Sequence, residues 1–160
     1  MLFSKHVLDI LSLGYCRLGI AGLSPVMPGT CGSFLAALLA PVLFLPLSLW
    51  GRLVFLGVVF WSGALAATRV ERLLGCKDPG SVVIDELLGV WIALLPFRTP
   101  DWVQILVTFL LFRLFDIWKP WPVHASETWL PNGYGVMIDD AIAGLMTLIV
   151  MGILCLVGIF

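Results

Sequence analysis

Long stretches without charge constrain the fold of this chain more than any other feature of its sequence. No Asp, Glu, Lys or Arg occurs from Leu18 to Gly51, and further apolar runs follow. Only 12% of the 160 residues are charged, whereas soluble domains carry about 25%. So few polar groups cannot cover a surface that faces water. We therefore expect an integral membrane protein whose spans are helices.

The charged residues divide the chain into five apolar runs, at residues 34–50, 53–68, 81–97, 102–118 and 138–160. A bilayer core takes about 20 helical residues, so several runs are short. Pro41 and Pro46 predict that the first run is kinked or re-entrant. Arg52 marks a predicted turn. The expected fold is all-α, with residues 1–160 forming one domain, a compact bundle of about five transmembrane helices.

The basic residues predict the orientation of this bundle. If the amino terminus lies in the cytoplasm, only Arg52 and Arg98 lie outside, which agrees with the positive-inside rule. Residues 1–22 then provide an amphipathic segment at the cytoplasmic surface. The formal net charge of −1 argues against a nucleic-acid partner, and the oligomeric state is left open.

In this orientation acidic residues from three segments reach the cytoplasmic side, namely Asp85, Glu86, Asp116, Asp139 and Asp140. Carboxylates so close together repel one another and attract a hard divalent cation such as Mg²⁺. The alternative is that the two acidic pairs only stabilise helix amino termini. Acidic groups near lipid are costly and usually functional, which favours a metal site. Gly89, Ala143 and Gly144 lie one turn away and would let two helices touch.

Phosphate-binding groups are predicted beside the acidic residues. The segment SPVMPGTCGS leads into a helix, where backbone N–H groups around Gly29, Thr30, Gly32 and Ser33 can hold an anion. Arg113 and Lys119 could neutralise phosphate charge. Alternatively, the segment is only a helix start, Arg113 pairs with Asp116 within one helix, and Lys119 anchors the helix at the membrane surface.

A transport function is the alternative to catalysis. A carboxylate cluster on a small helical bundle could also form a path for cations. Such a path needs polar residues deeper in the spans, where this sequence has Leu, Val, Ile, Phe and Ala. The sequence therefore favours an enzyme that uses carboxylates, a metal ion and water.

Four motifs in order, LSPVMPGTCGS, DPGSVVIDELLGVWIALLP, FRLFDIWKPWPV and GYGVMIDDAIAG, closely resemble the bacterial phosphatidylglycerophosphatase A family. The resemblance runs from about residue 22 to residue 145. It implies a Mg²⁺-dependent enzyme of the bacterial inner membrane that acts on a phospholipid, phosphatidylglycerophosphate, and releases its terminal phosphate to give phosphatidylglycerol. The active site would face the cytoplasm, because the lipid substrate is made on that leaflet.

The resemblance also implies roles for residues at the matching positions. Asp78, Thr30 and Lys119 belong to its motifs together with the acidic pairs and Asp116. The expected mechanism has Asp85, Glu86, Asp139 and Asp140 holding one or two Mg²⁺ ions. Asp139 or Asp85 would act as general base, while Lys119, Thr30 and nearby amides stabilise the phosphoryl group. A phospho-aspartate intermediate is the rival mechanism.

Overall fold

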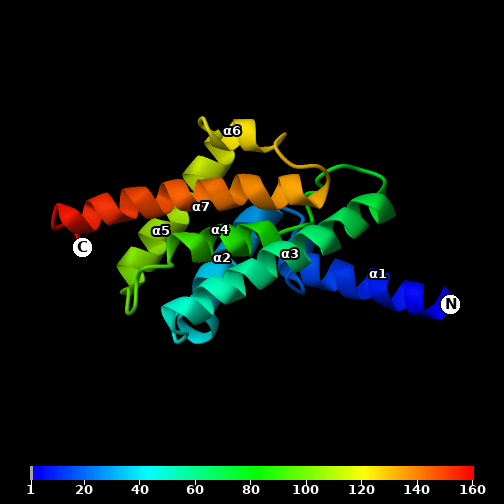
Figure 1. Ribbon diagram of the computed structural model, residues 1–160, viewed down its shortest axis with the longest axis horizontal. Coiled ribbons are helices and arrows are strands. Elements are labelled where there is room, and N and C mark those ends of the chain that lie inside the picture. The colour runs from blue at the N-terminus through cyan, green and yellow to red at the C-terminus, as the bar shows by residue number, and fades with distance from the viewer. Residues whose placement is uncertain (1) are drawn as a thin grey trace.

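The computed structural model describes residues 2–160, and all of its regular elements are helical. They are α1 (Leu2–Cys16), the 3-10 turn η1 (Ala21–Leu23), α2 (Pro28–Leu39), the π-helical segment η2 (Ala40–Phe44), α3 (Leu49–Leu74), α4 (Ile84–Ala93), α5 (Trp102–Trp118), α6 (Val123–Ser126) and α7 (Gly133–Leu156). The all-helical prediction is confirmed. The described ends of the chain lie at opposite ends of an elongated molecule (Figure 1).

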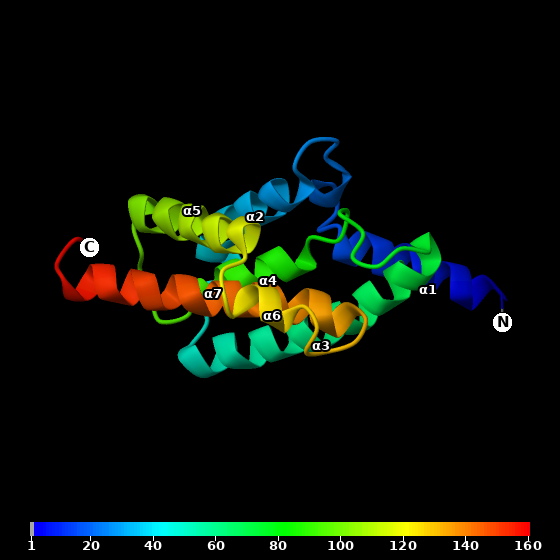
Figure 2. The same cartoon turned by 90° about the horizontal axis from the view of Figure 1, so that it is seen from above.

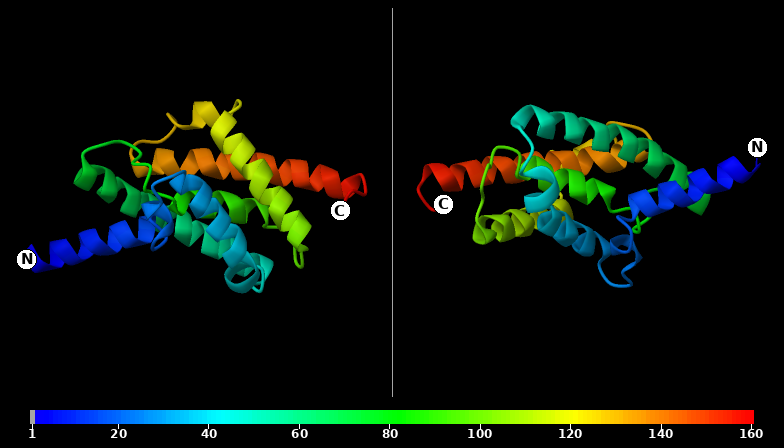
Figure 3. Two further views of the ribbon diagram at one scale, coloured as in Figure 1. Left: turned by 180° about the vertical axis from the view of Figure 1, so that it is seen from behind. Right: turned by 90° about the horizontal axis from the view of Figure 1, so that it is seen from below.

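The short helix α4 lies at the centre of the bundle. Helices α2 and α5 lie side by side on one flank and α3 lies on the other, with α4 and α7 between them (Figures 2 and 3). Every residue of α4 except Ile92 is buried. The indole of Trp91 stacks on Phe44 and donates a hydrogen bond to the carbonyl oxygen of Ala36 at 2.8 Å. The surrounding helices therefore cover both the apolar core of α4 and its acidic first turn.

Proline 41 breaks regular α-helical bonding in the first predicted span. Pro41 has no backbone N–H to donate. The α-helix α2 ends at Leu39, and the amide of Leu45 bonds five residues back to Ala40. The backbone here is π-helical, as segment η2, and the predicted kink or re-entrant path stays a prediction.

Arg52 does not mark a turn, and that prediction is wrong. It lies in the first turns of α3, and only 4% of its surface is exposed. Its guanidinium donates to the carbonyl oxygens of Leu45 and Leu47 before α3 and of Leu95 and Phe97 after α4. These carbonyls lack partners within a helix. The buried guanidinium therefore supplies hydrogen-bond donors to carbonyl oxygens of two segments at once.

Two helices, α3 and α7, are long and apolar enough to cross a membrane, and α2 with η2 forms a shorter apolar segment. Both long helices extend beyond the predicted runs, since α3 continues to Leu74 and α7 begins at Gly133. Helix α4 has ten residues and covers about 15 Å, half of a bilayer core of about 30 Å. The count of about five transmembrane helices stays a prediction.

Residues 2–16 form the helix α1, which packs against the second half of α3 (Figure 1). An ion pair between Asp9 and Arg69, at 2.6 Å, links the two helices. The outer face of α1 exposes Val7, Leu8, Ile10 and Leu11. Its position at the membrane surface stays a prediction.

Candidate active site

Three buried carboxylates from α4 and α7 meet at the centre of the bundle. Asp85 and Glu86 lie in the first turn of α4, and Asp140 lies in the second turn of α7. One carboxylate oxygen from each lies within 4.8 Å of the other two. Each residue is no more than 8% exposed, and each has a buried oxygen without a hydrogen-bond partner. The group therefore offers the oxygen ligands that a hard cation prefers, and some of these oxygens have no other partner.

Glycines bring the two acidic helices together. A Cβ atom on Gly144 of α7 would overlap the carbonyl oxygen of Gly89 of α4. One on Gly89 would lie 2.7 Å from the carbonyl oxygen of Asp140. The predicted backbone contact at these glycines is confirmed, and it sets the spacing between the carboxylates of α4 and α7.

The first turn of α2 forms another wall of the site. Helix α2 begins at Pro28, so Gly29 to Ser33 are helical and not part of a loop. A Cβ on Gly29 would overlap the Glu86 carboxylate, and one on Gly32 would lie 2.6 Å from Val83. The hydroxyl of Thr30 is buried and has no partner. Of this motif, Gly29 lines the cavity, while Gly32 serves close helix packing instead.

Arg113 of α5 forms one cationic edge of the site. Its Nη1 atom lies 2.5 Å from Asp116 Oδ2 and 3.8 Å from Glu86 Oε1, and it donates to Ser33 Oγ at 3.3 Å. The ion pair between Arg113 and Asp116 is the one expected from their spacing along a helix. Asp116 is thereby directed to Arg113 and is not one of the three carboxylates with mutually close oxygens.

Lys119, at the end of α5, forms the opposite cationic edge. Its amine donates to Glu127 at 2.5 Å and to Asp139 at 3.0 Å. The other Asp139 oxygen accepts the amide of Asp140. Sequence reasoning missed Glu127, because residues 120–132 have no periodicity that would place this side chain beside Lys119.

These contacts change the protonation of the Lys119 edge. Partial burial favours the neutral amine, but hydrogen bonds to Glu127 and Asp139 outweigh it and raise the pKa of Lys119 above its usual range. The hydrogen bond from Lys119 lowers the pKa of Glu127. Lys119 is therefore cationic throughout the neutral range.

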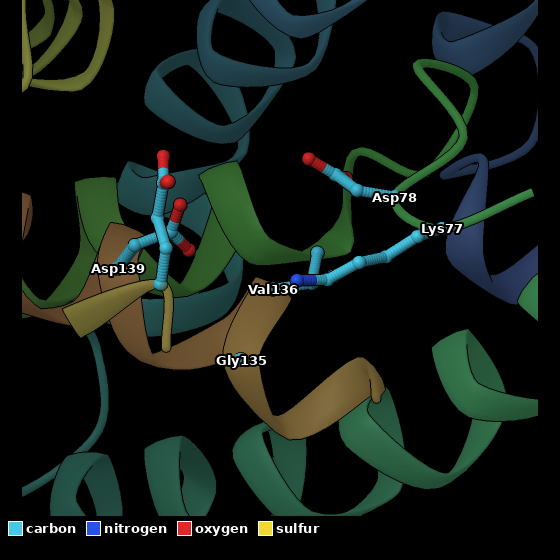
Figure 4. A pocket seen from close by; sticks show the side chains of 6 residues that line it. Lys77, Asp78, Gly135, Val136 and Asp139 are labelled. Atoms are coloured by element: carbon cyan, nitrogen blue, oxygen red, sulfur yellow. The ribbon is translucent and has the colours of Figure 1, made fainter. Parts of the chain in front are cut away.

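A cavity of about 440 Å³ joins these groups. It is lined by all five predicted carboxylates, by Arg113 and Lys119, and by Asp78 from the loop after α3. A smaller pocket of about 190 Å³ shares Asp78 and Asp139 with it. In Figure 4, Lys77 and Asp78 reach into this pocket from the loop, and Asp139 faces it from α7. Phosphate-sized anions can thus meet both carboxylates and cations here.

The family of the chain follows from a match that covers this whole site. Residues 15–155 match the sequence profile of the phosphatidylglycerophosphatase A family. The chain belongs to the phosphatidylglycerophosphatase A family. Every residue described above for the site lies inside the matched range. The match to the family therefore includes the residues of the cavity as well as the apolar helices.

Named relatives agree with this assignment. The phosphatidylglycerophosphatase A of Escherichia coli is 38% identical over 139 residues, covering 86% of this chain and 78% of the relative. That of Haemophilus influenzae is 37% identical over 131 residues, 82% of this chain and 80% of the relative. A Bacteroides thetaiotaomicron protein named "Putative phosphatidylinositol-3-phosphatase" is 38% identical, over 83% of this chain and 86% of the relative. No solved structure matches the chain.

Proposed function

We propose that this protein removes the terminal phosphate of phosphatidylglycerophosphate at the cytoplasmic face of the bacterial inner membrane, using Mg²⁺. Its membership of the phosphatidylglycerophosphatase A family and the two relatives of that name support the reaction. The two long apolar helices support a place in the membrane. The single observation that carries the proposal is the group of buried carboxylate oxygens without partners at the centre of the matched region.

The donor set fits Mg²⁺. Asp85, Glu86 and Asp140 offer three oxygens and no nitrogen or sulfur, which suits a hard cation that keeps water and phosphate as further ligands. Three buried carboxylates without a cation would be strongly destabilising. When bound, Mg²⁺ supplies positive charge opposite the phosphate and makes water a better nucleophile.

The protein's own residues bind and orient the phosphate. Lys119 and Arg113 place positive charge at opposite edges of the cavity, where they can stabilise charge on the transferred phosphoryl group. The first amides of α2, at Gly29 and Thr30, have no carbonyl partner within their helix and can donate to an anion. The hydroxyl of Thr30 is buried and unpartnered next to these amides, but it does not line the cavity.

We assign the general base to Asp139. It lines both the main cavity and the smaller polar pocket, so it meets water as well as substrate. Asp85 belongs to the group of three carboxylates that would hold the metal. The rival in which an Asp attacks phosphorus forms a phospho-aspartate, which water then hydrolyses, so the protein itself carries ³²P when turnover is quenched. Direct attack by water on the phosphate forms no phosphoprotein.

Phosphate release from phosphatidylglycerophosphate in detergent tests the proposal. Wild type, Asp139→Asn and the control Asp101→Asn are assayed with Mg²⁺ and with EDTA. Asp101 caps α5 at the other end of the bundle, and Asn retains a capping side chain. We expect Mg²⁺-dependent release that falls by roughly 100-fold in Asp139→Asn and is unchanged in Asp101→Asn. Full release in EDTA would contradict the role of the metal.

A further inference from the structure

We propose that the diacylglycerol part of the substrate reaches the cavity from the side, along the seam between α2 and α5, and that Met27 and Ile117 form the mouth of this route. The inference rests on the proposed function, because it takes a phospholipid monoester as the substrate.

The cavity wall changes character at this mouth. Inside the cavity the wall is dominated by carboxylates, Arg113 and Lys119. Among the described residues that line it, Met27 and Ile117 combine a large apolar side chain with strong exposure, 58% and 63%. A lipid has the same division, with charge at the headgroup and apolar surface beyond the glycerol. The boundary between them therefore falls at these two residues.

An apolar stripe on α5 leads to the mouth. Every exposed residue of this helix is apolar. Those spaced by three or four residues share one face, and they are Val103, Leu106, Leu110, Leu114 and Ile117. At 1.5 Å per residue the stripe covers about 21 Å, more than the roughly 15 Å of one bilayer leaflet. An acyl chain can thus follow α5 from the middle of the bilayer to the cavity.

Helix α2 forms the other side of the seam. It exposes Phe34 and Leu38, and it carries no charged residue. The ring of Phe34 meets that of Phe109 of α5 edge-on, with 6.0 Å between their centroids. The two helices lie side by side in Figure 2. Both faces of the seam are therefore apolar up to the point where Met27 precedes α2.

Met27 is held at the mouth by an unusual backbone. Its φ of +52° lies in the left-handed region, which residues other than glycine adopt at a cost. Its carbonyl oxygen nevertheless accepts the amide of Cys31 and starts α2. A methionine is flexible and apolar, so it can pack against acyl chains of different shapes.

The opposite opening of the site is polar. There Lys77, Asp78 and Glu127 line the smaller pocket (Figure 4), which shares Asp78 and Asp139 with the main cavity. Lipid and water therefore reach the phosphate from different sides. Released phosphate can leave through the pocket at Lys77 while the lipid product returns along the seam.

Narrowing the mouth tests the route. Ile117→Trp is compared with Leu65→Trp, whose residue is equally exposed, at 62%, on the far flank. Trp is well accepted near a membrane surface. Each variant is assayed on phosphatidylglycerophosphate in vesicles and on its deacylated, water-soluble counterpart.

We expect Ile117→Trp to lower kcat/KM on the vesicle lipid by about tenfold or more. Its activity on the soluble counterpart should change by less than about twofold, as should both activities of Leu65→Trp. An equal loss on both substrates would overturn the proposal, because Ile117 would then act on the headgroup. No loss on either would overturn it as well. If wild type releases no phosphate from either substrate, the proposed function fails instead.

A binding measurement decides the route without catalysis. Benzoylphenylalanine is placed at Leu114, on the seam, and at Leu65, as the control. The protein, carrying Asp139→Asn so that turnover is blocked, is illuminated in phosphatidylcholine vesicles that contain phosphatidylglycerophosphate and Mg²⁺, and the lipid adducts are identified by mass spectrometry. We expect the monoester to be enriched over the host lipid at Leu114 and not at Leu65. Equal enrichment at both positions, or none, would overturn the proposal.

Discussion

The three central carboxylates predict that Asp140→Asn stabilises the metal-free protein and weakens its stabilisation by Mg²⁺. Without a cation, burial and the two neighbouring carboxyl groups oppose ionisation of Asp140. Asp140→Asn should therefore stabilise the protein in EDTA, by about 1 kcal/mol in free energy of unfolding. With Mg²⁺, wild type should gain stability by binding, and the variant should gain little. Thermal unfolding in detergent checks this, with Asp101→Asn as control. Equal stabilisation of wild type and variant by Mg²⁺ would remove Asp140 from the metal site.

Replacing Glu127 should change the pH dependence of the phosphatase reaction. The hydrogen bond to Glu127 helps to keep Lys119 protonated, so Glu127→Gln should lower the pKa of Lys119. The protonated amine is then lost at a lower pH, and the alkaline limb of the pH–rate profile should shift downward. We also expect kcat/KM at neutral pH to fall by about tenfold.

His124→Gln is the matched control, since His124 is an exposed neighbour of Glu127, 3.7 Å away. It should leave both the rate and the profile as in wild type. An unshifted alkaline limb in Glu127→Gln would show that Glu127 does not tune Lys119.

Individual contacts differ in how far the sequence predicts them. The pair of Arg113 and Asp116 follows from helical spacing alone. The meeting of Asp85, Glu86 and Asp140 follows from charge bias and small residues one turn away. The contact of Lys119 with Glu127 does not follow from the sequence, because it depends on the path of the turn after α5. The burial of Arg52 does not follow from the sequence either, because its partners are backbone carbonyls, which every residue has.

The contact between α4 and α7 predicts which glycines matter. Gly144→Val would force the side chain into the backbone of Gly89 and separate the two helices. We expect a destabilisation of about 3 kcal/mol and loss of phosphatase activity. Gly152→Val is the control on the same helix, because a Cβ there meets nothing within 4 Å. Chemical unfolding in detergent and phosphate release measure both effects. Similar losses in the two variants would contradict a specific role for the contact.

Helix ends were predicted less well than helices. The second apolar run ends at Thr68, yet α3 continues to Leu74 and ends where Gly75 adopts φ of +68°. Helix α7 begins five residues before the predicted run, at Gly133, whose amide donates a hydrogen bond to the hydroxyl oxygen of Thr68 at 3.1 Å. The end of α3 and the start of α7 both depend on a glycine and on a neighbouring helix, and a hydropathy pattern contains neither kind of information.

The orientation of the whole molecule is open to test through its own cysteines. Cys76 is exposed in the loop after α3, while Cys16 is fully buried. Burial also raises the pKa of Cys16 to about 12, so it offers almost no thiolate. A variant that keeps only Cys76 should react with a membrane-impermeant maleimide in inverted vesicles and not in right-side-out vesicles.

A variant that keeps only Cys16 is the control and should stay unlabelled in both preparations until the protein is unfolded. Labelling of Cys76 in right-side-out vesicles would reverse the proposed orientation and place the candidate active site outside.

The short central helix has a consequence for how the protein is made. Helix α4 carries two acidic residues in ten, so it gains too little from lipid to remain there alone. Its largest contact is with α7, which the ribosome makes about 40 residues later, or roughly 2 to 8 s at usual rates. In the proposed membrane location, α3 can enter the bilayer during that interval while α4 remains at the surface. The carboxylates of the two helices are united only by this delayed docking, so a nascent chain without α7 is inactive.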